Sequence, residues 1–166
     1  MTEKKGDYRK WIYILNVLIP DTHNLKSKSM KVVIIEDEMY AAKRLENMIK
    51  EYNPSIEIAA WLESVSDSVE WFSTNPNPDL IFLDIHLEDD LSFAIFEKVE
   101  VLSPIIFTTA TDDLAIKAFT IKGIDFLHKP VVKAELANML VKYTNLNHKN
   151  LKPIGAGFFK ELLDNK

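Results

Sequence analysis

Six residues that could do chemistry stand at the ends of short apolar runs in this 166-residue sequence: Glu36, Asp37, Asp84, Thr108, Thr109 and Lys129. Carboxylates held a few ångströms apart repel one another and raise one another's pKa unless a cation joins them. Hard carboxylate oxygens, in a chain without cysteine, suit Mg²⁺, which keeps several of its waters. Carboxylates that bind Mg²⁺, together with a hydroxyl and an ammonium, are the groups that phosphoryl transfer to an aspartate requires.

In that chemistry an aspartate attacks phosphorus in line, while the metal ion and the ammonium neutralise the phosphoryl oxygens. Asp84 is the candidate nucleophile. Each residue alone also has an ordinary structural use. Asp37 and Glu38 could stabilise a helix start through its dipole, Asp84 could cap a turn, and Lys129 could be a solvated surface charge. The chemical interpretation depends on all of them meeting at one place.

The apolar runs predict buried strands. Residues 79–84 carry four consecutive apolar residues between Pro78 and the acidic residues 88–90, as in a central strand buried on both faces. Four further strands are expected over residues 32–35, 56–61, 104–107 and 124–127. Helices are expected over about residues 38–52, after a cap at Ser66–Asp67, around Phe93–Val99, from about Asp112 to Gly123, and over about residues 132–145.

Five strands alternating with five helices require parallel pairing through right-handed crossovers. The predicted fold class is therefore α/β, a doubly wound three-layer α/β/α sandwich with the flavodoxin-like strand order 2-1-3-4-5. The switch point of this order lies between the first and third strands, so Glu36, Asp37 and Asp84 become neighbours. Ligands of such folds bind just beyond the carboxyl ends of the strands.

Length and composition predict one domain with a full core, over residues 30–146, since 47% of the residues are hydrophobic. Residues 1–29 are expected to form a loosely attached extension, and residues 147–166 a tail or a truncated linker. The basic residues before Trp11–Ile19 superficially copy a signal peptide. Asn16 and the lack of a small-residue cleavage site favour the extension.

The net charge of −5 argues against direct nucleic-acid binding, which needs clustered Lys and Arg. Lys142, Lys149 and Lys152 are too few to bind DNA unaided. No apolar run approaches the roughly 20 residues that span a bilayer. A cytoplasmic protein with no membrane partner is the simplest expectation.

Several segments resemble the receiver domain of two-component response regulators: Ile34–Glu38, Leu83–His86, Thr109–Ala110 and Phe126–Pro130. The similarity covers about residues 31–145. Three finer stretches look like the receivers joined to LytTR-type (LytR/AgrA-like) DNA-binding domains: Pro78–His86, Leu91–Phe93 and Ile105–Ala110.

The resemblance implies a role for each residue of the acidic site. Asp84 would be the phosphoacceptor. Glu36, Asp37 and Asp84 would hold Mg²⁺, Asp37 more directly than Glu36, and the backbone carbonyl of His86 would complete the protein ligands. The side chain of His86 is expected to point to solvent. Such a protein is not a conventional enzyme, because at most it catalyses its own phosphorylation and dephosphorylation.

The resemblance also implies how a signal would leave the site. Thr109 would move onto the phosphoryl group, Lys129 would contact it, and Phe126 would turn inward as an aromatic switch. The Lys129–Pro130 peptide bond would be cis, a form tolerated before proline. The implied donor is a histidine kinase. The output surface, which could form a homodimer, would comprise the helix from Asp112, the fifth strand and the last helix (helix 4, strand 5 and helix 5).

Two positions depart from the family pattern. Asp90 stands where a glycine is usual, and aspartate tolerates a positive φ better than most residues. Thr111 replaces a frequent aromatic residue, which would leave the mouth of the site more open. Other functions stay open: a receiver that acts only by protein binding, a regulatory fragment of a LytTR-type transcription factor, and a haloacid-dehalogenase-type phosphotransferase. The last expects a second aspartate where His86 stands.

Overall fold

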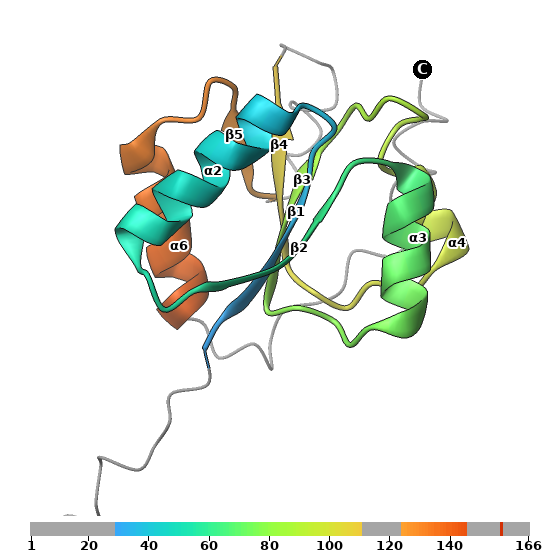
Figure 1. The fold of residues 1–166 in the computed structure, drawn as a ribbon, viewed down its shortest axis with the longest axis horizontal. Helices are drawn as coiled ribbons and strands as arrows, with labels where there is room; N and C mark the ends of the chain where they lie inside the picture. Colours follow the sequence, from blue (N-terminus) through green and yellow to red (C-terminus); the bar gives the residue numbers. More distant parts are fainter. Residues whose placement is uncertain (1–28, 111–123, 146–156, 158–166) are drawn as a thin grey trace, which may run out of the picture.

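The computed structural model describes residues 29–110, 124–145 and 157. Its elements are β1 (Lys31–Ile35), α2 (Met39–Tyr52), β2 (Glu57–Leu62), α3 (Val65–Thr74), β3 (Leu80–Asp84), α4 (Ala94–Lys98), β4 (Ile105–Thr109), β5 (Phe126–His128) and α6 (Lys133–Asn145). The sheet runs between two helical layers, with α2 and α6 on one face and α3 and α4 on the other (Figure 1). The helix expected from Asp112, the residue at position 111 and both chain ends lie outside the described residues.

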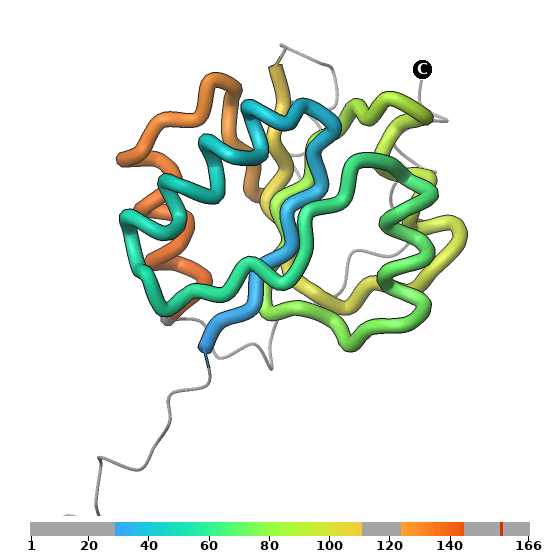
Figure 2. The backbone as a smooth tube through the Cα atoms, viewed as in Figure 1, coloured from blue at the N-terminus to red at the C-terminus, as the bar shows by residue number. Residues whose placement is uncertain are grey.

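All five strands pair in parallel in the order β2-β1-β3-β4-β5, which confirms the predicted fold class. Figure 2 shows why the sheet is doubly wound: α2 follows β1 on one side, and after β2 the chain continues on the other side with α3 and α4. The register sets Ile35 of β1 opposite Leu83 of β3. Glu36, which follows β1, and Asp84, the last residue of β3, therefore lie at the same edge of the sheet.

Two apolar cores lie on the two faces of the sheet, because successive side chains of a strand point to opposite faces. One core joins Val32, Ile34, Leu80, Phe82 and Ile106 to residues of α2 and α6. The other joins Val33, Ile35, Ile81, Leu83 and Phe107 to residues of α3 and α4. Burial on both faces explains why these strands appear in the sequence as continuous apolar runs.

One helix start differs from the sequence prediction. The side chain of Ser64, not Ser66, caps α3: Ser64 has an extended backbone, and its Oγ accepts the N–H of Asp67 at 3.0 Å. Ser66 already lies in the first turn. The helix expected around Phe93–Val99 is present as α4, which is short because Val99 returns to an extended backbone.

Asp90 does not adopt the positive φ that the usual glycine would allow, since none of the described residues other than glycine has one. The loop closes by hydrogen bonds instead: the N–H of Leu87 donates to the carbonyl of Asp90 at 3.1 Å, and that of Ser92 to the carbonyl of Ile85 at 3.0 Å. Within the described part of the chain, none of the helices has the length and apolarity that crossing a membrane requires.

Candidate functional site

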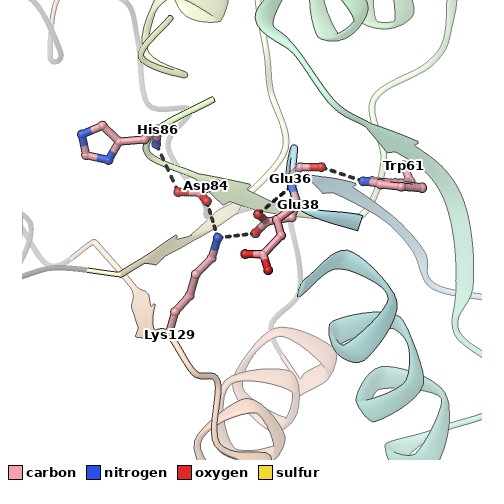
Figure 3. Close-up of polar contacts among 6 residues, drawn as sticks. All are labelled: Glu36, Glu38, Trp61, Asp84, His86 and Lys129. Carbon is pink, nitrogen blue, oxygen red and sulfur yellow. Dashed lines mark hydrogen bonds and ion pairs between the residues drawn. The ribbon is translucent and has the colours of Figure 1, made fainter. Parts of the chain in front are cut away.

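Lys129 links two buried carboxylates that come from neighbouring strands. Its Nζ lies 2.6 Å from Oε2 of Glu36 and also pairs with Oδ2 of Asp84 (Figure 3). Glu36 is 3% exposed and Asp84 is 6% exposed. Residues 36, 84 and 129, far apart in the sequence, therefore form one cluster at the carboxyl edge of the sheet.

The position of Lys129 follows from the end of β5. Its backbone N–H donates to the carbonyl of Thr109 at 2.7 Å, beside the last pair of β4 with β5, Thr109 and His128. The next peptide bond, Lys129–Pro130, is cis, the form that the resemblance implied. Strand β4 separates β5 from β3, so a long side chain is needed to reach Asp84.

The charged groups of the cluster shift one another's pKa values. Burial raises the pKa of Glu36, the hydrogen bond from Lys129 opposes that rise, and the charge of Asp84 adds to it. Burial by itself would lower the pKa of Lys129, but its bonds with Asp84 and Glu36 outweigh that effect and raise the pKa above the ordinary value. Lys129 therefore stays cationic between the two acids.

The third acid, Asp37, completes a set of possible metal ligands. One carboxylate oxygen from each of Glu36, Asp37 and Asp84 lies within 4.8 Å of the others. The three donors are hard oxygens, and the exposed side chain of Asp37 leaves room for waters. This donor set fits Mg²⁺, which binds through a few carboxylates and retains water.

His86 contributes its backbone and not its imidazole. Its N–H donates to Oδ1 of Asp84 at 3.1 Å. Its side chain is exposed and points away from the carboxylates in Figure 3, as expected. Asp84 is therefore held by two donors, one on each carboxylate oxygen.

The two candidate threonines are both buried in β4, but they differ in register. Asp84 lies opposite Thr108, and Thr109 lies one residue further, opposite His128. Because side chains alternate along a strand, the two hydroxyls belong to opposite faces of the sheet. Phe126 is half-buried, and its ring meets that of His128 edge-on with centroids 5.2 Å apart.

Two residues at this edge have no motif that would have revealed them. The indole N–H of Trp61 donates to the backbone carbonyl of Glu36 at 2.7 Å. The carboxylate of Asp89, in the loop after Asp84, accepts the N–H groups of Val65 and Ser66 at 2.9 and 3.2 Å, at the start of α3. Both contacts join segments about 25 residues apart, and only the folded chain brings them together.

A family model described as the response regulator receiver domain matches residues 32–141. The chain belongs to this family. It is thus a receiver domain of a two-component response regulator. It is 34% identical over 117 residues to the sensory transduction protein LytT of Bacillus anthracis, covering 69% of this chain and 47% of that protein. To LytT of Bacillus subtilis strain 168 it is 33% identical, covering 71% and 49%. The chain spans about half the length of these curated relatives.

Solved structures agree with the fold of this receiver. The crystal structure of the response regulatory domain of protein mrkE from Klebsiella pneumoniae is similar with a TM-score of 0.58 and 32% identity, covering 69% of this chain and 95% of that one. A CheY-like receiver domain from Methylobacillus flagellatus has a TM-score of 0.57 at 22% identity, covering 70% and 99%. At that identity the second likeness concerns the fold alone.

Proposed function

We propose that this receiver accepts a phosphoryl group on Asp84 from a histidine kinase in a Mg²⁺-dependent reaction. The observation that carries the proposal is the position of Lys129 between Glu36 and Asp84, with Asp37 beside them. Together these residues supply a nucleophile, a cation and an oxygen donor set at the edge where open parallel sheets bind ligands.

In the transfer step an oxygen of Asp84 attacks phosphorus and forms the new O–P bond. The P–N bond to the donor histidine breaks, and the imidazole nitrogen leaves with the electron pair. The ammonium of Lys129 contacts Asp84 before the reaction, and it would then form its ion pair with a phosphoryl oxygen instead. Glu36, Asp37 and the carbonyl of His86 would hold Mg²⁺, which supplies positive charge beside the phosphoryl oxygens.

Signalling would begin at Thr109, whose hydroxyl would donate to the phosphoryl group. Phe126, half-buried on the neighbouring strand, would turn inward in response. The output surface would combine β5, α6 and the segment from Asp112, and could serve as a homodimer contact. Replacing Thr109, but not Thr108, by alanine is expected to uncouple phosphorylation from the change at β5.

The test is covalent labelling of the full chain with acetyl phosphate and Mg²⁺, read by intact mass. Wild type is expected to gain one phosphoryl adduct, and Asp84→Asn none. Asp79→Asn is the matched control, because Asp79 flanks the opposite end of β3. An adduct of equal yield on Asp84→Asn, or none on wild type, would overturn the proposal. Absence from wild type is what a receiver acting only by protein binding predicts.

A second candidate is the regulatory part of a longer LytTR-type DNA-binding regulator. It is favoured by the LytT relatives, of which this chain matches about half. We propose residues 30–146 as the receiver domain in either case. The reading frame after the codon for Lys166 tests this candidate: a continuing LytTR-like sequence supports it, and an immediate stop codon contradicts it.

A further inference from the structure

The indole of Trp61 contacts the backbone of the acidic site from the edge strand β2. Its Nε1–H donates to the carbonyl oxygen of Glu36 at 2.7 Å, and Figure 3 shows the ring directed at that carbonyl. The side chain is not a core residue, since Trp61 is 39% exposed. Its hydrogen bond is therefore its most specific contact with the site.

This bond lies where the pairing of β1 with β2 ends. The N–H of Glu36 donates to the carbonyl of Leu62 at 2.9 Å, as in a regular parallel ladder. Strand β2 ends at Leu62, and Ser64 then caps α3. A side-chain N–H thus reaches the carbonyl of Glu36 at the point where the strand can no longer supply a backbone donor.

The hydrogen bond from Trp61 restrains the orientation of the Glu36–Asp37 peptide. Its carbonyl is held by Trp61, and the N–H of Glu38 donates to Oε1 of Glu36 at 3.3 Å. Asp37 itself is exposed, so the direction of its carboxylate depends on the backbone that carries it. Groups that orient metal ligands from outside the coordination shell typically change metal affinity 10–100-fold when removed.

We propose that Trp61 is a positioning residue for the metal ligands of this receiver: its indole N–H fixes the peptide after Glu36 so that Glu36 and Asp37 face Asp84. This role rests on the proposed function, because it takes these acids as the Mg²⁺ ligands. It assigns to the edge strand β2 a part in a site whose candidate ligands lie at the carboxyl ends of β1 and β3.

The test compares Trp61→Phe with Trp71→Phe in the full chain, using Mg²⁺ alone as the titrant in calorimetry. Trp71→Phe is the matched control, because it makes the same chemical change on α3, where the ring of Trp71 packs against Phe72 with centroids 5.1 Å apart. Trp61→Phe is expected to raise the Kd for Mg²⁺ at least about tenfold, and Trp71→Phe to leave it unchanged. The thermal midpoint without Mg²⁺ verifies that both variants are folded.

Equal Kd values for wild type and Trp61→Phe would overturn the positioning role and leave the proposed function standing. A wild type that binds no Mg²⁺ would overturn both. If Trp61→Phe does not fold, the indole N–H signal of wild-type Trp61 in NMR replaces the variant. That signal is expected to shift as Mg²⁺ saturates the site, and a signal that stays in place would overturn the role.

Discussion

The two ends of the sheet carry the same types of charged residue with very different consequences. At the amino end Lys31 lies 3.7 Å from Glu57, and both side chains are about half exposed. Asp79 there accepts the backbone N–H of Lys31 at 2.8 Å. These groups join neighbouring strands, but the side chains of Lys31 and Glu57 remain accessible to water.

At the carboxyl end, Lys129 lies 2.6 Å from Glu36, with side-chain exposures of only 18% and 4%. Asp84 joins the same lysine, so three strands contribute to one buried cluster. Exposed ion pairs contribute little because water and salt screen them, whereas buried charges depend strongly on their partners. Position in the fold, and not residue type, therefore decides which acids can do chemistry.

The largest effect is expected from Lys129→Met. Removing one preorganised donor aimed at developing charge typically slows a reaction by about 10²–10³-fold. The rate of adduct formation with acetyl phosphate, followed by intact mass, is expected to fall by that factor. Lys31→Met, at the amino end, should react at the wild-type rate. Similar rates for all three proteins would contradict the distinction between the two ends.

Mg²⁺ is expected to stabilise the folded protein only by binding at the carboxyl end of the sheet. At a concentration about 100 times its Kd, a ligand that binds only the folded state adds about 2.7 kcal/mol to the free energy of unfolding. Urea unfolding with and without Mg²⁺ measures this increment. Asp37→Asn should lose most of it and Asp79→Asn should keep it. An increment that survives Asp37→Asn would place the ion elsewhere.

Replacing Asp89 is expected to have a smaller, pH-dependent effect on the free energy of unfolding. Its slight burial acts to raise its pKa, but the N–H groups of Val65 and Ser66 outweigh that and lower it. A carboxyl with a lowered folded-state pKa stabilises the fold above its unfolded value of about 3.9 and loses that contribution as the pH falls. Asp89→Ala should therefore lower the free energy of unfolding near pH 7, by about 1 kcal/mol at most because water screens this exposed carboxylate.

The cost of Asp89→Ala should shrink as the pH falls below about 4, because wild-type Asp89 then becomes protonated. Urea unfolding across that range measures it. Glu88→Ala, a change at the neighbouring exposed acid, serves as the control. A cost that is the same at all pH values would mean that the charge at the start of α3 does not matter.

The smallest effect is expected at the amino end. Removing the exposed pair by Lys31→Met should change the free energy of unfolding by less than about 1 kcal/mol. Raising the salt concentration should reduce even that difference, since the two charges face water. A larger cost in urea unfolding would show that the amino end is more strongly coupled than its exposure indicates.

The order of strands and the edge that carries the acids were predictable. Continuous apolar runs such as Leu80–Leu83 indicate strands buried on both faces, and their alternation with helical patterns requires parallel crossovers. The predicted strand ends agree with the structure to within about two residues, as expected for frayed boundaries. The helix caps were less predictable from the sequence. Both Ser64 and Ser66 can cap a helix, and only the backbone conformation selects Ser64.

The sequence by itself determined which residues follow the strands, and hence that Glu36, Asp37 and Asp84 share one edge. Only the tertiary structure decided that Lys129 lies between Glu36 and Asp84, that Asp89 binds the start of α3, and that Trp61 holds the carbonyl of Glu36. The physical reason is that periodicity records burial, which repeats along the chain. A hydrogen bond between distant segments depends on side-chain reach and register, which leave no repeating pattern in the sequence.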